Sequence, residues 1–266
     1  MVLVTSVVLF LFGLLFGSFS NVCAWRVPRG ESVVRPRSHC PACGAMIAWQ
    51  RNIPVLSYLC LRGRCGDCGV PISSQYVLLE VLCGLLFAVQ GVVFPIGAAM
   101  GLGLVFSFGL LVLSVIDYHH QIIPDVFSLG LLLVGTLGAP WNGTLGETWS
   151  ARVLISLTGA AFGFTLMFVM AWAGEKVFKK EALGGGDVKL MAAVGAFVGW
   201  KGVLVCLFTG SLTGTLLASA MMLRGRMKRG DYLPFGPFLA FGGWVAWVGG
   251  HRVSSLLLAV YGSPFR

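Results

Sequence analysis

Acidic residues are scarce in this sequence. Only 10 of its 266 residues are Asp or Glu, against 19 Lys or Arg, and charged residues together make up 11% of the chain. Soluble domains carry about 25% charged residues, so this composition excludes a soluble fold. Hydrophobic residues make up 57% of the chain and its mean hydropathy is +0.87, which is typical of an all-α membrane protein.

Long runs without any charge define the predicted membrane spans, because a spanning helix needs about 20 apolar residues. The runs are 1–25, 81–116, 126–146, 153–174, 190–200, 202–223 and 232–251. The run 81–116 is long enough for two helices, which should separate near Pro95. The sequence therefore predicts a polytopic protein with about eight transmembrane helices, and 190–200 is the weakest candidate.

No basic residue precedes the first apolar run, and no small-x-small cleavage site follows it. Both absences argue against the alternative of a secretory signal peptide and favour a retained membrane anchor at 1–25.

Basic residues are concentrated in a few hydrophilic segments. The segments 26–64, 175–189 and 224–231 hold 15 of the 19 Lys and Arg residues. By the positive-inside rule these loops are cytoplasmic, and the N-terminus then lies outside. The net charge of +9 is therefore a topology signal; no aromatic residues are interleaved with the basic ones, so no nucleic-acid partner is predicted.

Four of the eight cysteines form two Cys-x-x-Cys pairs in the first hydrophilic loop, Cys40 with Cys43 and Cys65 with Cys68. A glycine follows each pair and allows the turn to present backbone amides to the sulfurs. This spacing predicts a structural zinc site with four thiolate ligands. The alternatives are two redox pairs or reduced thiols, although a cytoplasmic loop disfavours permanent disulfides.

The other four cysteines lie in or beside apolar runs, and we predict that they are buried small hydrophobic residues. They are Cys23, Cys60, Cys83 and Cys206.

Two aspartates stand at the ends of predicted spans, Asp117 and Asp187. A carboxylate at membrane depth is costly, so it indicates function by default. Asp117 ends its span, where an anion is unfavourable for a helix, and capping cannot explain it. Two such acids across a cavity could share a proton, which is the chemistry of an aspartyl hydrolase.

Asp187 follows three glycines, at 184–186, and begins an apolar run that is too short to cross a bilayer. A helix over 187–200 would be about 21 Å long, against about 30 Å for the hydrocarbon core. We therefore expect Asp187 to lie below the surface in a wet cavity lined by protein. The glycines would let an extended substrate strand approach. The simpler alternative is that Asp187 only caps its helix.

Four further polar residues lie near these spans. Asp125 follows Pro124 and is predicted to cap the next helix. His119 and His120 could be metal ligands or acid–base groups, but their interfacial position favours solvated side chains. Glu80 begins the second span and could pair with an arginine of the basic loop.

Two further segments contain polar or helix-starting residues. Asn21, near the end of the first span, could tie that helix to a neighbour. Pro-Phe-Gly-Pro at 234–237 is predicted to start the last helix, with proline in its first turn.

These elements, in this order, resemble the bacterial type IV prepilin peptidases. The matching segments are Gly-Ser-Phe-x-Asn-Val at 17–22, the cysteine loop at 40–68, Asn-Ile-Pro-Val-Leu-Ser-Tyr at 52–58, Ile116-Asp117 through Pro124-Asp125, Gly184-x-Gly186-Asp187-x-Lys189, and 234–237. A lone G-x-G-D motif would be weak, whereas the ordered set is specific. The G-x-G-D element is also similar to that of presenilin-type intramembrane aspartyl proteases.

The resemblance implies a bifunctional enzyme of the bacterial inner membrane. It would cut the basic leader from type IV prepilins or pseudopilins at the cytoplasmic face and methylate the new N-terminal residue with S-adenosylmethionine. Asp117 and Asp187 map onto the family's catalytic aspartates. Gly184, Gly186, Lys189 and Asp125 map onto motif positions that would support the site.

The implied organisation has three parts: a transmembrane helix at 1–25, a cytoplasmic four-cysteine loop at 26–75 that binds zinc and is linked to methyl transfer, and a transmembrane aspartyl peptidase domain at 76–266. Glu80 is a candidate for methyl transfer. The family usually has Arg and Pro where this chain has Gln75 and Val77, so this chain lacks any contact that the arginine makes in the family.

Two other classes of function fit parts of the pattern. A proton- or cation-coupled transporter could use Asp117 and Asp187 as ion sites, but it predicts inverted repeats, which the sequence lacks. A zinc-stabilised membrane scaffold would need no catalysis. Besides its substrate, the only partner that the sequence predicts is the lipid bilayer, and it makes no prediction of oligomeric state.

Overall fold

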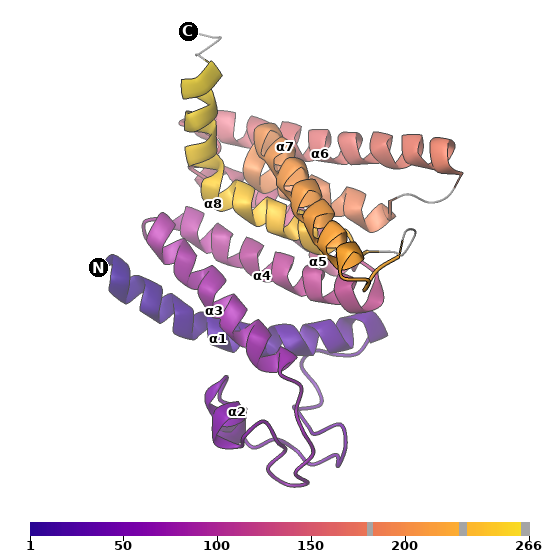
Figure 1. Cartoon of the computed structure of the whole chain (residues 1–266). Helices are drawn as coiled ribbons and strands as arrows, with labels where there is room; N and C mark the ends of the chain where they lie inside the picture. Colours follow the sequence, from indigo (N-terminus) through magenta and orange to yellow (C-terminus); the bar gives the residue numbers. More distant parts are fainter. Residues whose placement is uncertain (180–182, 229–232, 262–266) are drawn as a thin grey trace. The chain divides into compact units, whose positions relative to one another are not determined.

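The long apolar runs of the sequence form long helices, because a helix satisfies its own backbone hydrogen bonds in lipid. The structure is a computed structural model that describes residues 1–179, 183–228 and 233–261, with the backbone alone for 251–261. Lys180 and Arg229, which the sequence assigns to basic loops, lie outside the described residues. Within these ranges all regular elements are helices and no strand occurs (Figure 1). The predicted all-α class is confirmed.

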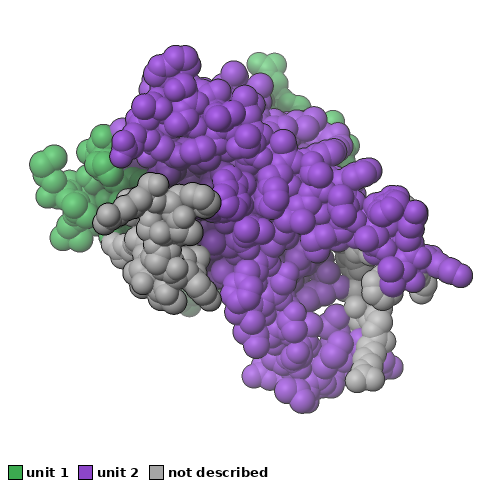
Figure 2. Space-filling view, turned by 90° about the horizontal axis from the view of Figure 1, so that it is seen from above, with its two compact units in different colours: residues 1–96 green, residues 97–266 purple. Residues whose placement is uncertain are grey.

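The chain forms two compact units, residues 1–96 and 97–266 (Figure 2). The first unit pairs the helices α1 (Val2–Arg26) and α3 (Gln75–Val93). The domain boundary predicted at 75/76 follows the end of the hydrophilic loop and stays a prediction.

Small residues let α1 and α3 approach closely. A Cβ atom added to Gly17 would lie 2.5 Å from the Cα of Glu80, so only glycine fits there. The side-chain amide of Asn21 donates to the carbonyl of Tyr76 at 3.4 Å. The predicted role of Asn21 in joining the first helix to a neighbour is confirmed.

The hydrophilic loop between these helices contains three short elements, η1 (Val27–Arg29), η2 (Trp49–Asn52) and α2 (Leu56–Cys60).

The second unit is a bundle around α7. Its elements are α4 (Ala98–His120), α5 (Asp125–Gly138), η3 (Ala139–Trp141), α6 (Trp149–Phe178), α7 (Gly185–Leu223) and α8 (Gly236–Tyr261). The first half of α7 is buried on every side and packs against α5, α6 and α8. A helix that is apolar all round forms the core of such a bundle. Stacking of Phe106 on Phe197, with ring centroids 4.3 Å apart, joins α4 to it.

Five described helices are long and apolar enough to cross a membrane, which makes this a multi-pass membrane protein. They are α1 with η1, α3, α4, α6 and α7; the stretch Asp125–Trp141 is a shorter apolar helix. The predicted count of eight spans is not confirmed. The break near Pro95 is confirmed, because α3 ends at Val93 and α4 begins at Ala98. The helices predicted at 190–200 and 202–223 both lie in α7, which consists of two helices that meet at a kink where Gly199 adopts φ 69° and ψ 177°.

Candidate active site

Asp117 lies in the last turn of α4 and is buried, with 5% of its surface exposed. Its Oδ2 atom accepts a hydrogen bond of 3.0 Å from the backbone N–H of Gly236, the first residue of α8. The partial positive charge at the start of α8 therefore faces this carboxyl group and offsets the unfavourable end of α4. Sequence reasoning identified 234–237 as a helix start but missed this contact.

Asp187 lies in the first turn of α7 and is equally buried, with 6% exposed. The residue before this helix is Gly184, and the Asp187 carboxyl group hydrogen-bonds to its backbone, as a helix-capping acid does. The Oδ1 atom of Asp187 has no hydrogen-bond partner among the described residues. Capping therefore accounts for part of this carboxyl group, and one buried oxygen is left available.

The two aspartates line one cavity of about 330 Å³ within the second unit. The residues that line it are Asp117, Gln121, Ile122, Ile123, Asp125, Gly184, Gly185, Gly186, Asp187 and Lys189. The charges of Asp117 and Asp187 interact across it. A cavity of this size can take a few residues of an extended peptide.

The glycine turn allows the segment after α4 to pack against the start of α7. A Cβ atom added to Gly186 would lie 2.7 Å from the Cβ of Ile123, so a larger residue would push the two segments apart. At Gly184 the nearest atom, Oδ2 of Asp187, would be 3.7 Å away, which is an ordinary contact. Gly186 is thus required for packing, whereas Gly184 leaves an accessible backbone at the cavity.

Asp125 and Lys189 form an ion pair that joins the first turns of α5 and α7. The distance from Lys189 Nζ to Asp125 Oδ1 is 2.6 Å, and the side chains of Lys189 and Asp125 are 40% and 57% exposed, respectively. Asp125 makes no capping hydrogen bond, so the predicted capping role is wrong and the ion pair replaces it. At this exposure the pair contributes little stability, about 0–1 kcal/mol, but it fixes the mouth of the cavity. His119 and His120 are exposed and do not line the cavity.

The four cysteine sulfurs of the first unit form a separate cluster. The sulfurs of Cys40, Cys43, Cys65 and Cys68 all lie within 4.8 Å of one another, and those of Cys40 and Cys68 are 3.9 Å apart. Tetrahedral thiolates at about 2.3 Å from one metal ion are about 3.8 Å apart, so the cluster could hold a metal ion.

The backbone prepares the Cys40 sulfur as a ligand, whereas at Cys68 the N–H of Val70 is outweighed by burial and by hydrogen bonds to the other sulfurs, which raise the pKa of that thiol to about 11. Hydrogen bonds from the N–H groups of Cys43 and Ala42 lower the pKa of the Cys40 thiol to about 7, which favours the thiolate. Gly44 and Gly69 close the two turns with φ of 72° and 71°, the conformation that the sequence required of them.

Comparison with known proteins settles the family. Residues 11–94 match the bacterial peptidase A24 N-terminal domain, and residues 104–263 match the type IV leader peptidase family. The chain belongs to the type IV leader peptidase family.

Three relatives bear the name prepilin leader peptidase/N-methyltransferase. The protein of Myxococcus xanthus is 43% identical over 82% of this chain and 63% of its own length. Those of Stutzerimonas stutzeri and Pseudomonas aeruginosa are each 33% identical, over 92% and 95% of this chain and 91% and 93% of their own lengths. The chain thus spans less than two thirds of the first relative and most of the other two. No solved structure gave a significant match.

Glu80 is buried inside the first unit. Its Oε2 atom accepts a hydrogen bond of 2.7 Å from the backbone N–H of Val55, and Ser18 also hydrogen-bonds to it. No ion pair between Glu80 and an arginine occurs in the described part of the chain. The arginine partner predicted as an alternative is therefore wrong, and Glu80 instead attaches the hydrophilic loop to α3.

The prediction that four cysteines outside the cluster are buried is only partly correct. Cys23, Cys83 and Cys206 are buried, but Cys60 ends α2 on the surface. An apolar neighbourhood in sequence does not ensure burial in an element as short as α2.

Gly236→Ala should lower the activity of the site about 10²-fold. An added Cβ atom would lie 2.6 Å from Oδ2 of Asp117, so the carboxyl group must move. A misplacement of about 1 Å in a catalytic group can lower the rate about 10²-fold. Gly130→Ala is the matched control, because nothing lies within 4 Å of a Cβ atom added there. Peptide cleavage by the two purified variants provides the measurement, and equal rates would show that the Gly236 contact does not position Asp117.

Proposed function

We propose that this protein is a membrane-embedded aspartyl endopeptidase that removes the basic leader of type IV prepilins or pseudopilins and then methylates the new N-terminal residue. The names of the relatives combine both activities. The observation that carries the peptidase proposal is the pair of buried aspartates on one cavity, where their charges interact. No finding favours the transporter alternative.

The surroundings of the two aspartates suggest their roles. The N–H of Gly236 and the start of α8 support a negative charge on Asp117, which suits it to act as the base that takes a proton from water. Asp187 has an unpartnered buried oxygen and suits the role of the acid that donates its proton to the oxygen of the scissile carbonyl. The water attacks the carbonyl carbon and forms a gem-diol. The carbon–nitrogen bond then breaks as Asp117 passes the proton it took from water to the leaving amine, and Asp187 takes its proton back from a hydroxyl of the gem-diol.

The substrate would lie extended along the glycine turn. The accessible backbone at Gly184 and Gly185 offers hydrogen bonds to a strand, and Ile122 and Ile123 offer apolar contacts inside the cavity. The loops of this protein are basic and would repel a basic leader, so apolar contacts with the segment after the leader dominate binding.

We place the protein in the bacterial inner membrane with the catalytic face in the cytoplasm and the N-terminus outside. The distribution of 15 of 19 basic residues supports this orientation. The metal of the cysteine cluster is zinc, which four thiolates select in a tetrahedral site. Its role is structural, because all four ligand positions are filled by the protein.

S-adenosylmethionine would supply the methyl group. The 330 Å³ cavity of the first unit, lined by Gln50, Arg51, Ile53, Leu56, Ser57, Cys60 and Leu61, contains no carboxylate and does not suit a sulfonium cation. We therefore assign no residue to donor binding and derive no step through it.

Glu80→Ala separates the two activities if Glu80 serves methyl transfer. The purified protein in vesicles, given a synthetic prepilin and the methyl donor, should yield a cleaved and methylated product. Glu80→Ala should yield a product that is cleaved but unmethylated, as read by mass spectrometry of the new N-terminus. Glu175→Gln, which alters an exposed acid on α6, is the control and should behave as the unmodified protein. Loss of both activities would show that Glu80 has a structural role, as its bond to Val55 would allow.

A further inference from the structure

The loop between α1 and α3 exposes apolar side chains where it forms α2. Leu56 is 60% exposed and Leu59 is 63% exposed. Ile53, which is also exposed, lines the 330 Å³ cavity of this unit together with Leu56 and Leu61. A contiguous apolar surface of this kind, with a cavity beneath it, indicates that something covers it.

The bond between Glu80 and Val55 attaches this surface to α3. The 19 residues of α3 extend about 28 Å, so the helix uses nearly its whole length to cross a hydrocarbon core of about 30 Å. Glu80 is the sixth residue of α3 and lies about 7.5 Å below its first residue. Its carboxyl group holds Val55, the residue before α2, at 2.7 Å. The start of α2 is therefore held close to the first turns of α3, which begin at the membrane surface (Figure 1).

Several backbone donors of this segment are satisfied internally, which lowers the cost of placing it against lipid. The hydrogen bonds are Ile53 N to Ser57 Oγ at 2.9 Å, Val55 N to Glu80 Oε2 at 2.7 Å, Leu56 N to Pro54 O at 2.6 Å, Ser57 N to Ile53 O at 3.0 Å and Leu59 N to Val55 O at 3.0 Å. Pro54 has no N–H to satisfy. A water-exposed loop has no need of such an arrangement, because water can accept from its amides.

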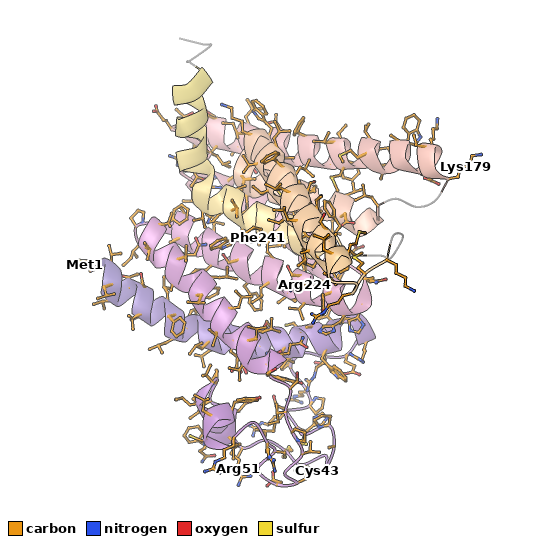
Figure 3. All side chains as sticks on the ribbon, in the orientation of Figure 1. Met1, Cys43, Arg51, Lys179, Arg224 and Phe241 are labelled. Atoms are coloured by element: carbon orange, nitrogen blue, oxygen red, sulfur yellow. The ribbon has the colours of Figure 1, made fainter. Side chains whose placement is uncertain are left out.

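Arginines flank the apolar stretch on both sides. Arg51 precedes it and pairs with Asp67 at 2.8 Å, and Figure 3 shows Arg51 at the outer edge of the loop. Arg62 and Arg64 follow it in the sequence. Arginine stems pack along apolar surface while their guanidinium groups reach anionic headgroups. An apolar face with flanking cations is the pattern of an interfacial membrane element.

We propose that residues 50–61 form an interfacial element that binds phospholipid. Ile53, Leu56 and Leu59 enter the acyl region of the leaflet on the side of the cysteine loop, and an acyl chain fills the cavity. Arg62 and Arg64 bind lipid phosphates. This contact holds the cysteine cluster at the membrane surface. Lipid binding by this element does not depend on the peptidase activity proposed above.

Photocrosslinking of the full-length protein tests the proposal. The photoreactive residue p-benzoylphenylalanine replaces Leu59 in one variant and Met46 in the other. Met46 is a matched control, because it is 71% exposed and apolar but belongs to the first cysteine turn. Both variants are reconstituted in vesicles of phosphatidylethanolamine and phosphatidylglycerol and irradiated, and mass spectrometry identifies the adducts. Leu59 should yield phospholipid adducts several-fold above Met46.

A second arm tests the role of Glu80 in positioning this element. Glu80→Ala in the Leu59 probe variant should reduce the lipid adducts toward the level of Met46, because Val55 is released from α3. Equal lipid adducts at Leu59 and Met46 in the parent protein would overturn the proposal. Adducts of Leu59 with an added prepilin, in place of lipid, would also overturn it and assign the surface to a protein partner. The comparison of Leu59 with Met46 in the protein that retains Glu80 tests the proposal even if Glu80→Ala does not fold. A separate cleavage assay on the same vesicles reports on the proposed peptidase activity.

Discussion

Asp117→Asn and Asp187→Asn should each lower leader cleavage by about 10³-fold or more while the protein still inserts and binds substrate. Asparagine keeps the size of the side chain and much of its hydrogen bonding, but it can neither take nor give the acid–base proton. Both carboxyl groups line one cavity and are buried, so no neighbouring water can substitute freely for either. Cleavage of a synthetic prepilin by purified protein, at matched protein levels, provides the measurement.

The double variant should be no less active than either single variant, because catalytic groups that act as a unit do not contribute additively. If either single variant retained substantial cleavage at normal protein levels, the aspartyl mechanism would be excluded and an ion-transport role for the pair would regain support.

Asp125→Asn is the internal control for this experiment. Asp125 lines the same cavity, but its partner Lys189 and its own carboxylate are both partly exposed. Loss of such a pair costs about 0–1 kcal/mol, so cleavage should stay within about tenfold of the parent rate. A loss as large as that of Asp117→Asn would show that the third acid takes part in the chemistry.

The features that the sequence predicts well are those that a single segment specifies. A bilayer demands runs of about 20 apolar residues, so α1, α3, α4 and α6 follow from hydropathy. The four cluster cysteines follow from the spacing of the two pairs. Asp117 and Asp187 were identifiable because acids at the ends of spans are costly and rare.

The features that the sequence missed depend on contacts between distant segments. The N–H of Gly236 reaches Asp117 over 119 positions, and a backbone amide leaves no mark in the sequence beyond the glycine itself. The local sequence around Asp125 resembles a helix cap, yet its carboxylate forms an ion pair with Lys189, 64 positions away. Local sequence patterns predict local structure, whereas tertiary packing determines the contacts of Asp117 and Asp125.

The break in the buried helix α7 follows from a single charge. Lys201 divides the apolar runs 190–200 and 202–223, and this division predicted two helices. Two helices do meet within α7, at a kink where Gly199 takes a conformation that glycine allows. The charge therefore located the break to within two residues.

Cys68→Ser should remove the metal from the cysteine loop, whereas Cys60→Ser should retain it. The two residues lie in the same loop and both are exposed, but only the sulfur of Cys68 belongs to the cluster. Structural zinc sites contribute about 10–16 kcal/mol of binding free energy, so loss of one ligand should open the loop between residues 35 and 70 to proteases. Elemental analysis should give about one zinc ion per chain for the parent and for Cys60→Ser, and much less for Cys68→Ser.

We expect cleavage to be less affected than methylation or loop stability, because Asp117 and Asp187 belong to the other unit. Metal-free parent protein with full activity would refute the zinc assignment.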